Sequence, residues 1–142
     1  MPIIGHKRLK IVVSLALIND ADEILLSKRP KNKHLAGFWE FPGGKLEERE
    51  SLQECLRREI REELDFEIEV GEVLCSVDHA YTHVSITLYA LSARYKEGEP
   101  KAIGCADWRW VYPEQLDDFA FPRSDRKVIE FVRQRGWQLA LF

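Results

Sequence analysis

One amphipathic segment between residues 51 and 64 constrains the fold of this chain more than any other. Leu52, Leu56, Ile60 and Leu64 follow one another at steps of four residues, with strong helix formers between them. In an α-helix this spacing places the four apolar side chains on one stripe, which has to be buried against another element. The segment therefore predicts a helix over 51–64 that packs on a core.

The rest of the chain alternates strand and turn signals, with one further helix near the end. Asn19 to Asp22 supply turn residues between two apolar runs, which predicts a hairpin. We expect strands over 10–17, 23–27, 66–77, 85–95 and 108–111, and a last helix over 124–134 that Ser124 or Asp125 is placed to cap. Without regular βαβ alternation, and at 142 residues, this indicates one domain over 1–142 of the α/β (α+β) class.

Composition narrows the class of protein. Hydrophobic residues make up 45% of the chain and the net charge is −3, so a core is expected and a basic, duplex-coating surface is not. Cys55, Cys75 and Cys105 form no CxxC pair, which disfavours a disulfide framework and a thiolate zinc site. The apolar run over 11–18 is too short to span a bilayer. We expect a cytoplasmic protein that binds neither duplex nucleic acid nor a membrane.

Acidic residues crowd the polar side of the predicted helix. Glu59, Glu62 and Glu63 stand at positions i, i+3 and i+4, so a helix places their carboxylates within one turn. Their repulsion, a few tenths of a kcal/mol per pair, is removed when a divalent cation binds between them. Carboxylate oxygens suit Mg²⁺ or Mn²⁺, which in turn bind phosphate oxygens. The alternative is a solvated face, because arginines are interspersed with the acids.

Two glycines precede this helix. Gly43 and Gly44 permit backbone conformations that other residues avoid, which would let a carbonyl turn toward a metal. From Gly44 to Phe66 the chain follows the pattern GX5EX7REUXEEXGU, where U is a bulky apolar residue, except that Asp65 stands at the late glycine. At these positions the sequence resembles the Nudix hydrolases. Asp tolerates the left-handed conformation that ends a helix better than most residues do, so we expect the helix still to end at Asp65.

The resemblance extends beyond this motif. WEFPGGK at 39–45, KRP at 28–30 and AFPRSD at 120–125 are similar to the MutT branch, and DHAYTHVSITL at 78–88 is similar to the 8-oxoguanine-reading C-terminal domain of adenine-DNA glycosylases. The resemblance implies a Nudix fold, a mixed β-sheet sandwiched between helices. It also implies hydrolysis of a nucleoside triphosphate, 8-oxo-dGTP first, to monophosphate and pyrophosphate. The alternatives are a CTP- or dCTP-type pyrophosphatase and a non-catalytic 8-oxoguanine reader, which the intact helix carboxylates disfavour.

The resemblance also implies residue roles. Glu59, Glu62 and Glu63 would bind divalent cations together with the Gly43 carbonyl, Arg58 would orient Glu59 and Glu62, and Glu50 would support this site. Positions expected to contact the nucleotide are Arg29, His34, Glu40, Phe41, Pro42, Gly43, Lys45 and Asp125. For Phe41 a plain core role is the alternative, and for Arg29 and His34 it is an exposed loop charge. The expected state is a monomer or a homodimer.

Three positions depart from the MutT pattern or carry less weight. Asp125 falls where MutT-type enzymes place an Asn that reads the base; an ionised Asp accepts hydrogen bonds only, so it donates only when protonated. Gly104 stands where such enzymes often carry one more glutamate, and Asp107 is three residues out of register. Tyr81, Thr82 and His83 are weaker candidates for base contact, with Tyr81 and His83 expected on one face. His79 and His83 are possible replacements for the missing glutamate.

Overall fold

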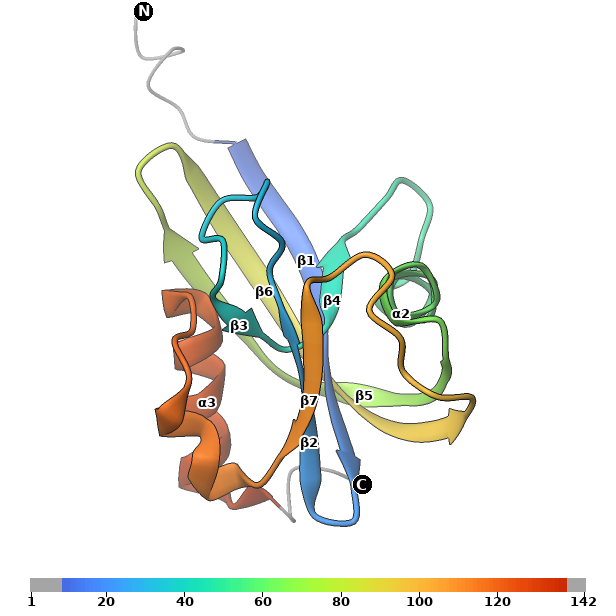
Figure 1. Ribbon diagram of the computed structural model, residues 1–142. Coiled ribbons are helices and arrows are strands. Elements are labelled where there is room, and N and C mark those ends of the chain that lie inside the picture. Colours follow the sequence, from blue (N-terminus) through green and yellow to red (C-terminus); the bar gives the residue numbers. More distant parts are fainter. Residues whose placement is uncertain (1–8, 138–142) are drawn as a thin grey trace, which may run out of the picture.

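The computed structural model describes residues 9–137, which form one mixed β-sheet with a helix on each side (Figure 1). The strands are Leu9–Asp20 (β1), Glu23–Lys28 (β2), Trp39–Glu40 (β3), Gly43–Lys45 (β4), Glu67–Ala80 (β5), Val84–Glu97 (β6) and Asp107–Val111 (β7). The helices are Leu52–Leu64 (α2) and Arg123–Arg135 (α3), and a 3-10 turn, Pro113–Asp118 (η1), precedes α3. The expected α+β class and the mixed sheet between helices are confirmed.

The sheet is organised around β1. Its order is β3-β2-β1-β6-β5, with β4 also pairing with β1 and β7 with β2. β1 and β6 run parallel, from Leu9 opposite Val84 to Ile18 opposite Ala93, whereas the other pairs are antiparallel. Since β1 contacts both β4 and β6, it brings the glycine-rich segment before α2 and the central hairpin β5–β6 to one end of the sheet.

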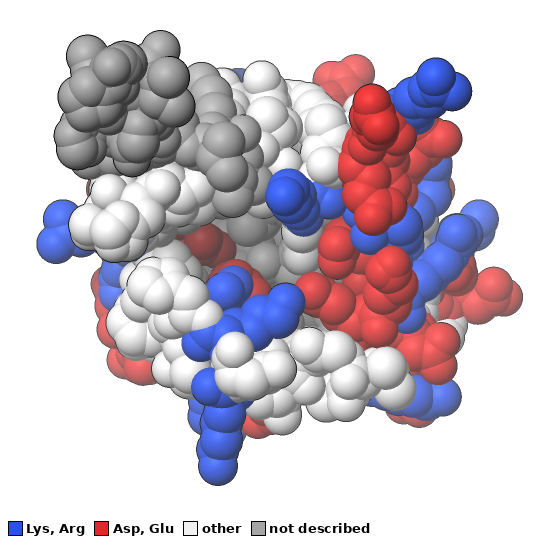
Figure 2. Space-filling view, turned by 90° about the horizontal axis from the view of Figure 1, so that it is seen from above, with Lys and Arg blue, Asp and Glu red and all other residues white. Residues whose placement is uncertain are grey.

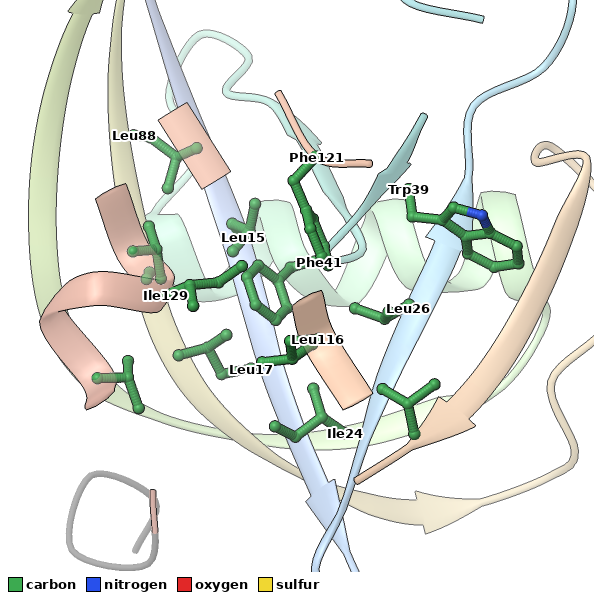
Figure 3. Packing of buried hydrophobic residues seen from close by; sticks show 14 of the residues in the cluster. Leu15, Leu17, Ile24, Leu26, Trp39, Phe41, Leu88, Leu116, Phe121 and Ile129 are labelled. Carbon is green, nitrogen blue, oxygen red and sulfur yellow. The ribbon is translucent and has the colours of Figure 1, made fainter. Parts of the chain in front are cut away.

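Each face of the sheet buries its own apolar cluster. Side chains alternate along β1, so that Leu15 and Leu17 face the cluster under α3, while Ala16 and Ile18 face the cluster under α2. Phe41 lies in the middle of the α3-side cluster, beside Leu15 and Phe121 (Figure 3). These two layers hold α2 and α3 on opposite sides of the strands that carry the candidate site.

Helix α2 begins and ends by local chemistry that the sequence carries. Ser51 accepts the N–H of Glu54, and the Glu54 side chain accepts the N–H of Ser51, which is a capping box. The helix ends at Asp65, whose φ of 52° and ψ of 46° are left-handed and whose N–H donates to the Arg61 carbonyl. The predicted helix and its end at Asp65 are confirmed, with Ser51 as the cap rather than the first helical residue.

The predicted strands are confirmed with longer bounds, and the turn of the first hairpin has Ala21 and Asp22 at φ 50° and 63°, as a two-residue turn of this kind requires. β3 and β4 were not expected as strands, because two and three residues give no alternation to detect. Between residues 9 and 137, no helix is long and apolar enough to cross a membrane.

The last helix corrects one expectation. α3 begins at Arg123, its cap is Pro122 without a side-chain hydrogen bond, and Asp125 lies inside the first turn. Neither Ser124 nor Asp125 therefore caps the helix, and that interpretation is wrong. The reason is that Pro122, with its φ of −59°, ends the extended segment one residue earlier, which leaves Ser124 and Asp125 to be buried at 5% and 3% exposure.

Candidate active site

A pocket of about 540 Å³ opens at one end of the sheet, where α2, β4 and the start of α3 approach one another. Figure 2 shows a hollow on this face, with acidic side chains gathered along one side and Lys and Arg side chains on its rim. Of the residues predicted to act, those that line the pocket are Arg29, His34, Glu40, Phe41, Gly43, Lys45, Glu59, Glu63 and Asp125. The pocket therefore joins residues from distant parts of the chain.

The glycines of β4 allow a close approach to α2. A Cβ built on Gly44 would lie 2.2 Å from the carboxyl carbon of Glu59, so a larger residue would displace that carboxylate. Neither Gly43 nor Gly44 has a positive φ. Among the described residues, the glycines with a positive φ are Gly37, Gly98 and Gly136. The expected need for a special backbone conformation is therefore wrong, and the requirement is for space.

Arg58 is the centre of a network of hydrogen bonds on α2. Its Nε lies 2.6 Å from Glu50 Oε2, and one terminal nitrogen donates to Glu50 Oε1 and to the Lys45 carbonyl, both at 3.0 Å. Its other terminal nitrogen lies 3.2 Å from an oxygen of Glu59 and 3.2 Å from an oxygen of Glu62. These bonds lower the pKa of Glu50 to about 2, which keeps it ionised. Arg58 thus holds the carboxylates of Glu59 and Glu62 to one terminal nitrogen of its guanidinium.

Glu59 and Glu63 are the carboxylates of α2 that reach into the pocket itself. Only 15% of the Glu59 side chain is exposed, and burial raises its pKa although Arg58 opposes the change. Burial raises the pKa of Glu63 to about 8, and the nearby charges of Glu59 and Glu40 add to the effect. Packing two acids this closely, away from water, disfavours their ionised forms until a positive charge joins them.

These groups fit a divalent cation by their chemistry. Oxygen donors from carboxylates and a backbone carbonyl are what Mg²⁺ and Mn²⁺ prefer. Partial burial disfavours the ionised forms of Glu59 and Glu63, and a cation bound between them would stabilise both charges. Within residues 9–137, no three carboxylate, imidazole or thiol groups already converge as a metal cage. Glu62 differs from Glu59 and Glu63, because its side chain is 55% exposed, pairs with Arg58 and does not line the pocket.

The opposite wall of the pocket carries a second ion pair. Arg29 donates to Glu40 Oε1 at 2.9 Å and to the backbone carbonyl of His34 at 2.7 Å, which fixes its guanidinium over the opening. Burial raises the pKa of Glu40 despite the charge of Arg29. The side chain of His34 is exposed, so its definite contribution in this structure is the carbonyl that holds Arg29.

Asp125 and Phe41 meet at the inner end of the pocket. Asp125 Oδ2 accepts the backbone N–H of Phe41 at 3.1 Å across 84 residues of sequence, which ties α3 to the segment between β3 and β4. Burial, with the charge of Glu40 added to it, raises the pKa of Asp125 far above its ordinary range. Phe41 stacks on Phe121, with ring centroids 5.8 Å apart, so it belongs both to the core and to the pocket wall.

Tyr81, a weaker candidate from the sequence, lies in the pocket wall. Its hydroxyl lies 3.1 Å from both the backbone nitrogen and the hydroxyl of Ser124. Because β5 ends at Ala80, residues 81–83 form the turn, and the expectation that alternation puts Tyr81 and His83 on one face is wrong. Thr82 and His83 are exposed and do not line the pocket. No sequence signal pairs Tyr81 with Ser124, since 43 residues separate them.

The packing of the segment before β7 explains why residue 104 is a glycine. Its N–H, like that of Ile103, donates to the Glu63 carbonyl at 3.0 Å, and a Cβ on Gly104 would lie 3.3 Å from Glu63 Cα. A side chain there would press on the end of α2. Asp107 instead begins β7, where it accepts the N–H of Trp108, and does not line the pocket. Cys105, which sequence reasoning did not single out, does line it.

The remaining predicted residues lie around the pocket rather than in its wall. Glu50 and Arg58 are behind it, in the network already described. Pro42 is buried, and its carbonyl accepts the N–H of Ala16 at 2.8 Å, so it holds the segment between β3 and β4 against β1. His79 stacks edge-on against the Tyr81 ring at 4.5 Å and is not in the pocket wall.

The fold is a mixed sheet between two helices. At its charged pocket, the helix that carries the carboxylates lies beside the glycine-rich strand β4, an arrangement that suits a hydrolase. The model of the NUDIX domain matches residues 13–131, and the chain belongs to the Nudix family. It is a Nudix hydrolase of the MutT type.

Relatives and solved structures agree with this assignment. The chain is 35% identical over 120 residues to a CTP pyrophosphohydrolase of Escherichia coli, which covers 84% of this chain and 89% of that protein. It is 28% identical over 128 residues to the 8-oxo-dGTP diphosphatase of Escherichia coli, which covers 90% and 98%. The crystal structure of the MutT protein from Methanosarcina mazei superposes with a TM-score of 0.81 at 27% identity, over 92% of this chain and 98% of that one.

Proposed function

We propose that this protein hydrolyses nucleoside triphosphates to monophosphate and pyrophosphate, and that 8-oxo-dGTP is its preferred substrate. The observation that carries the proposal is the pocket itself, whose wall includes the carboxylates of Glu59 and Glu63 on α2 and the buried Asp125 on α3. A triphosphate and a base need two such sets of groups, one anionic enough to hold cations and one able to form directed hydrogen bonds. Sanitation of the nucleotide pool in the cytoplasm would be the corresponding role.

At the phosphate end, Glu59, Glu62 and Glu63 with the Gly43 carbonyl would hold Mg²⁺ or Mn²⁺. A bound cation of this kind polarises phosphoryl oxygens and lowers the pKa of water. Arg58 keeps Glu59 and Glu62 oriented, and Glu50 keeps Arg58 in place. Arg29 and Lys45 line the same pocket and supply positive charge for the phosphates.

At the base end, Asp125 reads the edge of the base. With its pKa raised by burial, the carboxyl group keeps its proton at neutral pH and offers one donor and one acceptor, as an Asn does. Guanine presents two acceptors, N7 and O6, on its major-groove edge, whereas 8-oxoguanine has an N–H at position 7. A donor and an acceptor side by side therefore match the oxidised base better than guanine.

CTP is the second candidate substrate. The same donor and acceptor of a protonated Asp125 match the amino group and ring nitrogen of cytosine, and the relative that is 35% identical is named for CTP. The two candidates differ in ring size, so a nucleotide panel separates them.

The direct test is pyrophosphate release from 8-oxo-dGTP, dGTP, CTP and dCTP in the presence of Mg²⁺, and again after EDTA. We expect turnover that EDTA abolishes and a higher kcat/KM for 8-oxo-dGTP than for dGTP. Absence of turnover with every nucleotide would refute the enzymatic proposal. Equal kcat/KM values for dGTP and 8-oxo-dGTP would refute the proposal that 8-oxo-dGTP is the preferred substrate.

Substitution of the acids tests their roles. Glu62→Gln and Glu63→Gln remove one charge each without changing size, and we expect kcat to fall by at least about a hundredfold while the far-UV spectrum stays the same. Glu69→Gln, at an exposed position of β5, is the matched control and should keep full activity. Activity retained by either of the first two variants would remove that residue from the metal site.

A further inference from the structure

The turn between β5 and β6 reaches the start of α3 through one side chain. Tyr81 follows β5, its N–H donates to the Val84 carbonyl, and its ring stands edge-on to His79. The Tyr81 hydroxyl lies 3.1 Å from the backbone nitrogen of Ser124. Because Pro122 provides no side-chain cap, this hydroxyl accepts one of the N–H groups that the first turn of α3 leaves free.

The direction of the bond between the two hydroxyls follows from the bond to Asp125. The Ser124 hydroxyl donates its one hydrogen to Asp125 Oδ1 at 3.4 Å, which is long for a hydrogen bond between oxygens. Ser124 Oγ therefore accepts from the Tyr81 hydroxyl, 3.1 Å away. Each hydroxyl thus accepts from one neighbour and donates to the next, so the chain runs one way, toward the Asp125 carboxyl group.

This chain determines how Asp125 faces the pocket. Ser124 donates to Oδ1 and the backbone of Phe41 donates to Oδ2, so each carboxyl oxygen has one position occupied on the protein side. The plane of the group is thereby held, and its remaining donor and acceptor positions face the pocket that Asp125 lines. A base that matches them binds without reorienting a buried side chain.

We propose that Tyr81 and Ser124 are positioning residues for base selection, which hold the Asp125 carboxyl group in one orientation toward the nucleotide base. The inference rests on the proposed function, because it concerns how the same pocket chooses among nucleotides. Neither residue touches the phosphate end, so their effect should fall on KM and on the choice of base, with kcat preserved.

If Tyr81 only caps α3, loss of the Ser124 hydroxyl should not affect nucleotide choice. The Ser124→Ala variant therefore separates capping of α3 from orientation of Asp125. This variant keeps the backbone N–H that Tyr81 accepts, so the start of α3 stays capped, but it removes the donor to Asp125. We expect the ratio of kcat/KM between the best and the second-best nucleotide of the panel to fall about threefold to tenfold through KM, with kcat within about twofold of the wild type.

The companion variants fix the interpretation. Tyr81→Phe should lower the same ratio and also lower thermal stability, whereas Ser124→Thr, which keeps a hydroxyl, should restore the ratio. Tyr95→Phe removes a tyrosine hydroxyl from the far end of β6 and should leave the ratio unchanged. If Ser124→Ala keeps the wild-type ratio, the inference is overturned and Tyr81 only caps α3. If the wild type hydrolyses no nucleotide, the proposed function falls and this inference with it.

Discussion

Gly44 leaves the space that the Glu59 carboxylate occupies, and this steric relation is testable without measuring activity. Gly44→Ala places a Cβ where that carboxylate lies, so we expect the free energy of unfolding to fall by about 1–3 kcal/mol. In a Glu59→Ala background the same substitution meets no carboxylate and should be nearly neutral. Urea unfolding of the four proteins in this cycle checks the coupling. Equal losses in both backgrounds would show that the close approach is not the reason for the glycine.

Asp125 makes the stability of the fold depend on pH. Its raised pKa means that, above its ordinary value of 3.8, the unfolded chain loses a proton that the folded protein keeps. The folded state then binds more protons, so wild-type stability falls as pH rises from about 4 toward the raised pKa. Asn does not titrate, and we therefore expect Asp125→Asn to become progressively more stable than the wild type over this range.

Denaturant unfolding at pH 5 and pH 8 measures this effect, with Asp118→Asn as the exposed control. A difference between Asp125→Asn and the wild type that stays constant with pH would contradict the burial of a protonated carboxyl group. The same variant tests base reading, because Asn also offers a donor and an acceptor.

At the scale of elements, the end of α2 carries a small strain. Asp65 is left-handed, a conformation that disfavours residues with a Cβ, and Lys101 lies 3.6 Å from its carboxylate at an exposed position. We expect Asp65→Gly to raise the free energy of unfolding by less than about 1 kcal/mol, because relief of strain outweighs a weak surface pair.

Chemical unfolding of Asp65→Gly, with Asp65→Asn beside it, separates the two contributions. Asn removes the charge but tolerates the left-handed conformation, so it should change stability less than Gly does. A loss of stability on Asp65→Gly would show that the contact with Lys101, or the greater freedom of glycine in the unfolded chain, outweighs the strain.

Elements were predictable from sequence where the pattern was long. The period of four in α2 and the alternation in β5 and β6 are local signals, and both elements are present. The sequence does not predict β3 and β4, because two or three residues show no alternation, although Glu40 of β3 and Gly44 of β4 line the pocket. The cap of α3 was misplaced because Asp125 has the chemistry of a cap, whereas its place is decided by the tertiary bond to Phe41.

At the scale of the whole molecule, the sign of the charge differs between the two sides of the pocket. Lys33 and Lys31 are both exposed residues of one loop, but Lys33 lines the pocket and Lys31 does not. We expect Lys33→Ala to raise KM for a nucleoside triphosphate about twofold to tenfold and to weaken the rise of KM with ionic strength. Lys31→Ala should change neither quantity. Steady-state rates at low and high salt, with Mg²⁺ in excess, measure both.

An equal effect of Lys31→Ala and Lys33→Ala would indicate general attraction by the loop rather than contact within the pocket. That Glu59 and Glu63 lie at one pocket was predictable, because their motif is contiguous over residues 44–66. The base end was less so, since Tyr81, Ser124 and Asp125 meet only through the packing of the β5–β6 turn on α3.

The parallel pairing of β1 with β6 has a consequence for how the protein is made. β2 and β4 pair with β1 soon after it is made, but the strand that covers its other edge starts only at Val84, and Asp125 of the pocket follows later still. In a growing chain one edge of β1 therefore stays unpaired until β6 is made, and the pocket stays incomplete until α3 emerges. Contacts so distant along the chain also favour slow folding. The nascent protein is thus most exposed to aggregation before it becomes competent to bind substrate.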